Sequence, residues 1–228
     1  MRWILTLVIM SLPVAACAQP AAPPLSTEKD KLSYAMGMDL GGQLKANSVE
    51  IDPDVFARGL KDALSGGKTL LTEQEARTAI ASLQMAMVSR RTAEAAASGA
   101  KNKAEGEKFL ADNKAKEGVV TLPSGVQYKI LTAGTGRKPT AEDTVVCQYR
   151  GTLIDGKEFD SSYKRGQPAT FQVNKVIKGW TEVLQLMPVG SKWQVFIPPA
   201  LAYGERGAGV EIGPNATLIF EIELLGIK

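Results

Sequence analysis

The sequence predicts an α+β protein with an all-helical N-terminal dimerisation region, a long connecting helix and a C-terminal antiparallel half-barrel sheet wrapped on one short helix. Three observations support this fold class. Apolar residues recur at helical spacing, behind N-cap signals, over residues 27–117. From residue 118 onward they alternate as in half-buried strands, with Gly- and Pro-rich turns between the strands. Residues 180–187 form a short helical stretch within this second half.

The first 16 residues have the pattern of a bacterial export signal. An apolar run over residues 3–12 follows one basic residue and is too short to span a bilayer. The small residues before Cys17 resemble a lipobox, so we expect Cys17 to be acylated and to anchor an outer membrane lipoprotein. The alternative is cleavage after Ala18, which would leave a soluble periplasmic protein. Either outcome predicts a location in the bacterial cell envelope.

Composition changes along the chain predict four segments. They are a signal peptide (1–16), a Pro/Ala-rich spacer (17–26), a helical region with its connecting helix (27–117) and a C-terminal domain (118–228).

The composition excludes several classes of function. The sequence has no histidine, which removes histidine metal ligands and the Ser-His and Cys-His nucleophiles. Its two cysteines form no CxxC motif, so no zinc or redox site is expected. The formal net charge is only +3, which is not the strong positive charge typical of nucleic-acid-binding proteins. We therefore expect no metal, no cofactor, no nucleic-acid partner and membrane contact only through a lipid anchor.

Two capped helices are predicted at the start of the helical region. Thr27 and Asp30 form a capping pattern at the first, and Asp52 followed by Pro53 begins the second. Their apolar stripes are Leu32, Met36, Leu40 and Leu44 in the first, and Val55, Phe56, Leu60 and Leu64 in the second. The pair Gly41-Gly42 predicts fraying within the first helix.

A third helix is predicted to run for about 45 residues, roughly 68 Å, from a capping box at Thr72 and Glu75. Its first part has an apolar face that includes Ile80 and Leu83. From Arg90 onward nearly all apolar positions are Ala, which predicts a solvated arm.

The apolar stripes of these helices exceed what one copy can bury. Methionine pairs at 36/38 and 85/87 suit an adaptable interface. We therefore expect a homodimer, with a monomeric helical cap as the alternative.

Five strands are predicted in the C-terminal domain, over residues 125–131, 143–153, 169–173, 191–198 and 216–225. The last alternates most clearly, with Phe220 and Ile222 on one face and Glu221 and Glu223 on the other.

The short helix raises a question, because Trp180 stands at its start directly after Gly179. A core tryptophan needs no such position, and a tryptophan at the floor of a pocket is the alternative. Leu184 and Met187 complete the buried stripe of this helix, and Pro188 ends it.

Segments of the second half together resemble one known family. They are YRGTLIDGKEFDSSYKRGQPATFQV, VIKGWTEVLQLMPVGSKWQVFIPPALAYGERG and IGPNATLIFEIELL. The pattern is similar to that of the FKBP-type peptidyl-prolyl cis-trans isomerases. The layout of export signal, helices, long helix and isomerase domain resembles the Mip-like (macrophage infectivity potentiator) bacterial subgroup. The resemblance implies an FKBP-like half-barrel over residues 118–228 and a dimer formed through the N-terminal helices.

The resemblance also implies a substrate pocket. Its catalytic residues would be Asp160, Tyr203 and Tyr149, and its binding residues Phe159, Val176, Ile177, Trp180 as the floor, Ile212 and Phe220. Tyr203 would donate a hydrogen bond to the substrate carbonyl after the proline. Asp160 would lie beside the twisting carbonyl or orient Tyr149, and the N–H of Ile177 would hold the ligand backbone. Taken singly, the tyrosines also fit core positions and Asp160 fits an Asx-turn.

Two departures from the family pattern predict a shallow pocket rim. Ala169 stands where many small eukaryotic members carry an aromatic residue. The loop 207–210 is small and apolar.

The function implied by the resemblance is peptidyl-prolyl cis-trans isomerisation, by desolvation and twisting of the Xaa-Pro amide in an apolar pocket. No nucleophile or cofactor is required, in agreement with a chain that lacks histidine. The expected substrates are proline-containing exported or unfolded polypeptides, and macrolides such as rapamycin and tacrolimus are the expected inhibitors. The alternatives are a dimeric chaperone or binding module with isomerisation secondary, and a surface adhesin.

Overall fold

The computed structural model describes residues 25–228. The predicted signal peptide, Cys17 and most of the spacer lie outside these residues. The chain divides into two compact units, one ending at Glu75 and the other spanning Ala76–Lys228, and each is described by itself. No helix within 25–228 is long and apolar enough to cross a membrane.

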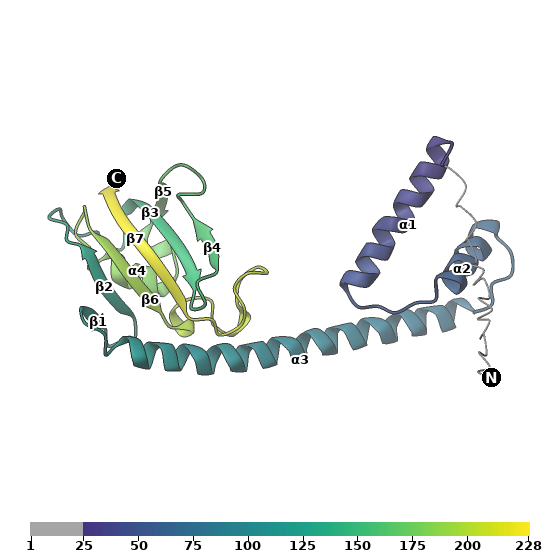
Figure 1. Cartoon of the computed structure of the whole chain (residues 1–228), viewed down its shortest axis with the longest axis horizontal. Coiled ribbons are helices and arrows are strands. Elements are labelled where there is room, and N and C mark those ends of the chain that lie inside the picture. The colour runs from purple at the N-terminus through teal and green to yellow at the C-terminus, as the bar shows by residue number, and fades with distance from the viewer. Residues whose placement is uncertain (1–24) are drawn as a thin grey trace, which may run out of the picture. The chain divides into compact units, whose positions relative to one another are not determined.

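The first unit contains helices α1 (Glu28–Ala46) and α2 (Pro53–Ser65), shown in purple and blue in Figure 1. Both predicted caps are confirmed. The Thr27 hydroxyl accepts from the N–H of Asp30, and the Asp30 carboxylate accepts from the N–H of Thr27. The Asp52 carboxylate caps α2 by accepting from the N–H groups of Asp54 and Val55. Fraying at Gly41-Gly42 was a wrong expectation, because α1 continues unbroken to Ala46.

Neither α1 nor α2 buries a single residue in this chain. The side chains of the predicted stripes are exposed except that of Leu44, which is half-buried; Met36 is 65% exposed, Leu60 53% and Leu64 80%. A groove of about 560 Å³ runs between the two helices, with Leu40, Leu44 and Phe56 in its walls.

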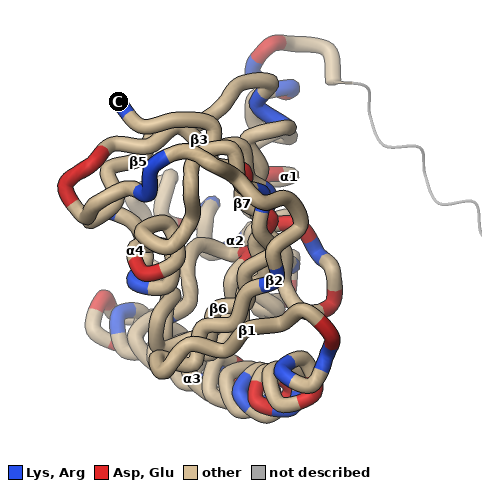
Figure 2. Tube along the Cα trace, turned by 90° about the vertical axis from the view of Figure 1, so that its left-hand side faces the viewer, with Lys and Arg blue, Asp and Glu red and all other residues tan. Residues whose placement is uncertain are grey.

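Helix α3 (Glu73–Asn113) has 41 residues and begins at the predicted capping box, in which the Thr72 N–H donates to the Glu75 carboxylate. Figure 2 shows basic and acidic residues interspersed along it. The solvated-arm interpretation is wrong for its last part, because Gly99, Gly106 and Asn113 are buried against the C-terminal domain. Glycine and alanine allow close approach of backbones, which a count of large apolar residues overlooks.

The second unit is built on a seven-stranded antiparallel sheet. Its strands are β1 (Val119–Thr121), β2 (Gln127–Thr132), β3 (Thr144–Leu153), β4 (Glu158–Ser161), β5 (Ala169–Gln172), β6 (Lys192–Ile197) and β7 (Leu218–Ile227). Their order is β1-β2-β6-β7-β3-β4, and β5 pairs with β3. All five predicted strands are present. The two additional strands, β1 and β4, have three and four residues, too few to produce a visible alternation.

The core lies between the sheet and the short helix α4 (Lys178–Leu184), which begins two residues before the predicted stretch 180–187 and ends three residues before its end (Figure 1). Met187 is fully buried even so, in the turn that follows. A Cβ on Gly179 would lie 2.5 Å from Cγ2 of Ile197, so only glycine lets α4 pack this closely on β6. Three 3₁₀ turns complete the unit: η1 (Val173–Lys175), η2 (Pro199–Leu201) and η3 (Gly204–Arg206).

Candidate active site

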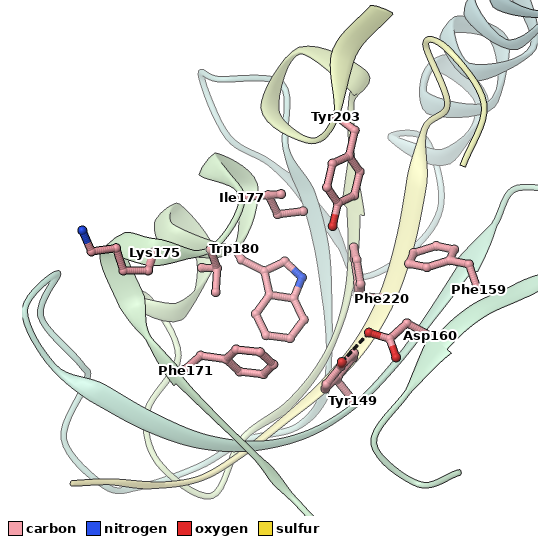
Figure 3. Close-up of a pocket in the computed structure, with 10 residues that line it drawn as sticks. Tyr149, Phe159, Asp160, Phe171, Lys175, Ile177, Trp180, Tyr203 and Phe220 are labelled. Atoms are coloured by element: carbon pink, nitrogen blue, oxygen red, sulfur yellow. Dashed lines mark hydrogen bonds between the residues drawn. The ribbon is translucent and has the colours of Figure 1, made fainter. Parts of the chain in front are cut away.

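An open pocket of about 460 Å³ lies between α4, the sheet and the turns after β6 (Figure 3). Ten residues line it: Tyr149, Phe159, Asp160, Phe171, Lys175, Val176, Ile177, Trp180, Tyr203 and Phe220. Most of these side chains are aromatic or aliphatic, with polar groups at the edge. This is the usual composition of a site for a small, largely apolar ligand group.

Trp180 forms the floor of this pocket and is only 4% exposed. Its ring meets those of Tyr149, Phe171 and Phe220 edge-on, with centroids 5.2 to 5.4 Å apart. The edge-to-face geometry is favourable for aromatic quadrupoles and holds the indole in one orientation. Its Nε1–H is buried and has no hydrogen-bond partner among the described residues.

The wall of the pocket formed by Phe159 and Phe220 depends on Gly151 of β3. A Cβ at this position would lie 2.6 Å from the ring of Phe159 and 2.8 Å from that of Phe220. Because glycine leaves this space free, the two rings pack edge-on at 5.5 Å. The glycine in the "YRGTL" segment thus shapes the pocket without lining it.

Val176 and Ile177 lie on the extended segment that leads into α4. The carbonyl of Ile177 accepts from the N–H groups of Trp180 and Thr181, which ties this segment to the first turn of the helix. Its own N–H donates to no acceptor within the described residues. A backbone donor is therefore available beside the pocket.

A polar network occupies the rim where β3 and β4 pair. The Tyr149 hydroxyl donates to Oδ2 of Asp160, and Oδ1 of Asp160 accepts from the guanidinium of Arg165. The same guanidinium donates to the Tyr149 hydroxyl at 2.6 Å and lies 5.3 Å from the centre of its ring. Arg165 thus ties both polar groups of the rim together.

The network fixes the charge states at the rim. Burial acts to raise the pKa of Asp160, but the hydrogen bonds from Tyr149 and Arg165 outweigh it, and its pKa lies below the ordinary value. Burial and the adjacent carboxylate raise the pKa of Tyr149. At neutral pH the rim therefore holds a carboxylate, a guanidinium and a neutral phenol.

Tyr203 approaches from the opposite side, on the turn between η2 and η3, and is 40% exposed. Its hydroxyl points into the pocket (Figure 3) and makes no hydrogen bond with any described residue. Burial, followed by the charge of Asp160, raises the pKa of Tyr203, so this hydroxyl stays protonated as a donor at neutral pH.

Comparison with known proteins identifies the two halves of the chain. Residues 135–225 match the family described as FKBP-type peptidyl-prolyl cis-trans isomerase. Residues 29–130 match the domain that lies amino-terminal to such isomerases. The chain belongs to the FKBP-type peptidyl-prolyl cis-trans isomerase family.

Relatives of this FKBP-type chain span nearly its whole length. Outer membrane protein MIP of Legionella longbeachae is 51% identical over 226 residues, which cover 99% of this chain and 97% of that protein. Peptidyl-prolyl cis-trans isomerase Mip of Coxiella burnetii is 46% identical, over 91% of this chain and 90% of its own. The crystal structure of FkpA from Escherichia coli superimposes with a TM-score of 0.69 at 36% identity, covering 90% of this chain and 99% of its own.

The structure brings eight of the nine residues expected in the FKBP-type pocket to its lining. The exception is Ile212, which is 7% exposed and belongs to the hydrophobic core. Its backbone pairs with Ala208. That Ile212 closes the far side of the pocket stays a prediction. Ala169 and the loop 207–210 are likewise absent from the lining.

Three residues of the site were missed from the sequence. Phe171 lies on β5, within the predicted strand 169–173, where no role was assigned to it. Lys175 and Arg165 are charged residues in turns, which are usually solvated. Proximity to Phe159-Asp160 in the chain was the one signal that could have indicated Arg165.

Proposed function

We propose that this protein isomerises Xaa-Pro bonds of exported polypeptides in the pocket floored by Trp180. The observation that carries the proposal is the contrast between a dry aromatic floor and a few fixed polar groups on the rim. A proline ring fits such a floor, and the rim groups fit the amide on either side of it.

The chemistry needs no covalent step. Rotation about an amide costs about 18–20 kcal/mol because the planar bond has partial double-bond character. Proline brings the cis and trans forms within about 1 kcal/mol of each other but leaves their exchange slow. Water favours the planar, more polar amide over the twisted one. A pocket that replaces water with aromatic rings reduces that preference, and so lowers the barrier.

The polar groups then set the orientation of the substrate. The Tyr203 hydroxyl, which has no hydrogen-bond partner among the described residues, donates to the substrate carbonyl that follows the proline. The free N–H of Ile177 holds the adjoining backbone. The Asp160 carboxylate lies beside the twisting carbonyl, with its position fixed by Tyr149 and Arg165.

Rapamycin and tacrolimus would occupy the same pocket and inhibit the enzyme. The substrates we propose are proline-containing polypeptides outside the cytoplasm, because residues 1–17 carry an export pattern with a lipobox-like end. Acylation at Cys17 would anchor the enzyme in the cell envelope. The relative from L. longbeachae, named an outer membrane protein, supports this location.

The exposed apolar side chains of α1 and α2 support a homodimer formed by residues 27–90. Helices with no buried residue of their own gain stability when a second copy covers their apolar faces. The domain boundary proposed at residue 118 assigns dimerisation to the helical region and catalysis to the region after it.

A second function, chaperoning of unfolded chains, is favoured by the groove of about 560 Å³ between α1 and α2. One experiment separates the two functions. The rate of cis-trans exchange in a short prolyl peptide is measured with the full mature chain, with and without rapamycin, and aggregation of an unfolded protein is measured in parallel. We expect catalysis that rapamycin abolishes. If the protein does not accelerate the exchange over the uncatalysed rate but still suppresses aggregation, the proposal of isomerisation is overturned and chaperoning takes its place.

A further inference from the structure

The last four turns of α3 pack on the loop that follows η3. A Cβ on Gly99 would lie 3.1 Å from Cβ of Pro214, and a Cβ on Gly106 would overlap the Thr217 hydroxyl. Phe109 packs on Phe196 of β6, with ring centroids 5.8 Å apart. Small residues in the helix therefore allow it to seat directly on the loop backbone.

Hydrogen bonds join this helix to the turn at Pro214-Asn215 in both directions. Nδ2 of Asn102 donates to the carbonyl of Pro214 at 2.8 Å, and Nδ2 of Asn215 donates to the carbonyl of Gly99 at 3.5 Å. The first bond has good length and the second is weak. Asn215 has φ 55°, a left-handed conformation that asparagine tolerates better than most residues. Asn102 is thus the main polar link between the helix and this turn.

The turn at Pro214-Asn215 is hydrogen-bonded to Gly204, the residue after Tyr203. The N–H of Asn215 donates to the carbonyl of Gly204 at 2.8 Å. A cavity of about 390 Å³ lies behind this point, lined by Gly204 and Glu205 on one side and by Lys103 and Glu107 of α3 on the other. A Cβ on Gly204 would meet nothing within 4 Å. The bond from Asn215 therefore supports the segment that carries Tyr203 from its C-terminal side, while the bond from the Ala202 N–H to the Pro199 carbonyl holds it on the other side.

We propose that Asn102 is a positioning residue for the isomerase pocket, acting through Pro214 and Asn215 on the backbone at Gly204 and so on the direction of the Tyr203 hydroxyl. Helix α3 then helps to position a residue of the site, in addition to connecting the two parts of the chain. This inference rests on the proposed role of Tyr203 in holding the substrate carbonyl. A donor that is displaced by a fraction of an ångström costs rate, because catalysis depends on near-attack geometry.

The test uses the full mature chain with Asn102→Ala, which removes the side chain, and Asn102→Asp, which keeps its shape but replaces the donor with an acceptor. The matched control is Lys101→Ala, since Lys101 is the exposed neighbour on the same helix and forms an ion pair with Glu105 at 3.9 Å. We expect kcat/KM on a short prolyl peptide to fall about three- to tenfold in both Asn102 variants and to stay unchanged in the control. A wild-type kcat/KM in both folded Asn102 variants would overturn the proposal.

A double-variant comparison separates positioning from general damage. In the Tyr203→Phe background, Asn102→Ala should cost less than half of its effect in the wild type, on a logarithmic scale, because the hydroxyl that it positions is absent. If Tyr203→Phe alone is slow but the two losses add fully, the coupling is refuted and the proposed function stands. If Tyr203→Phe alone is as fast as wild type, the role of Tyr203 and the coupling both fall.

Amide hydrogen exchange supplies an independent readout. In Asn102→Asp, the amides of residues 204–215 should exchange faster, while those of β3 and β7 stay as protected as in the wild type. Equal protection of 204–215 in the two proteins would contradict the proposed support.

Discussion

The hydroxyl of Tyr149 on β3 lies 2.5 Å from Oδ2 of Asp160 on β4, and Arg165 bonds to both residues. The phenol donates to the carboxylate while it accepts from the guanidinium. Each group is thus held by two others, and the carboxylate stays charged at the edge of an aromatic pocket. These two hydrogen bonds explain why the partly buried carboxyl of Asp160 remains ionised at the rim of the pocket.

Arg165→Gln should lower kcat/KM about three- to tenfold, because Asp160 and Tyr149 lose the partner that orients both. The substitution also removes one cause of the lowered pKa of Asp160. A carboxylate with a lowered pKa in the folded state stabilises the fold above its unfolded pKa, and this contribution is lost as the pH falls through the folded pKa. The stability lost in Arg165→Gln should therefore be larger at pH 7 than at pH 3.

The matched control is Lys164→Gln, which removes the neighbouring cation that pairs with Glu158 at 2.9 Å. Chemical denaturation at the two pH values and peptide assays of all three proteins check the prediction. An equal loss of kcat/KM in both variants would assign the effect to surface charge and not to the network.

Asp160→Leu and Tyr203→Phe should each lower kcat/KM about ten- to a hundredfold with the domain still folded, because each removes one oriented polar contact from an apolar site. Glu223→Gln should leave the rate unchanged, since alternation along β7 directs this side chain to the face opposite Phe220. Peptide kinetics beside circular dichroism check the three variants. Wild-type rates in both folded pocket variants would mean that the pocket assignment is wrong.

The pH profile of kcat/KM should be flat from about pH 5 to about pH 9. The pKa of Asp160 is lowered, and those of Tyr149 and Tyr203 are raised, so all three titrate outside this window. The sequence has no histidine that could titrate inside it. A step or a bell-shaped profile within the window, measured on a substrate without ionisable side chains, would show that another titrating group takes part.

The mature chain should sediment as a dimer, and a fragment of residues 95–228, which keeps the packed part of α3, as a monomer. Leu60→Glu should dissociate the dimer, because it introduces a charge on the apolar face of α2, where Leu60 is 53% exposed. Lys61→Ala, on the adjacent position of the same helix, should not. A monomeric wild-type chain at micromolar concentration would rule out the proposed role of the helical region.

Mass spectrometry of the mature N-terminus should find an acylated Cys17, because small residues precede it at the end of an apolar run. Cys17→Ser should move the protein from the membrane fraction to the soluble envelope fraction. An unmodified chain that begins at Gln19 would instead favour soluble export.

Local patterns in the sequence determined much of this fold. The caps at Thr27, Asp52 and Thr72 are contacts between residues two or three apart, so they can be recognised without any tertiary information. The alternation along β7 likewise identified its buried face. The position of Trp180 directly after Gly179 raised the question of a pocket floor, and the family resemblance of the segment around it implied that answer.

The tertiary structure decided what depends on residues far apart in the chain. The sequence gives no sign that Ile212 pairs with Ala208 and joins the hydrophobic core, which is what the folded chain shows. In the sequence Arg165 looks like any arginine in a turn. Its role follows only from the pairing of β3 with β4, which brings Tyr149 and Asp160 within hydrogen-bond distance of its guanidinium. The packed end of α3 was read as solvated because burial by glycine leaves no periodic apolar signal. Its contact with Pro214 joins residues 112 positions apart in the chain, and only the folded geometry specifies it.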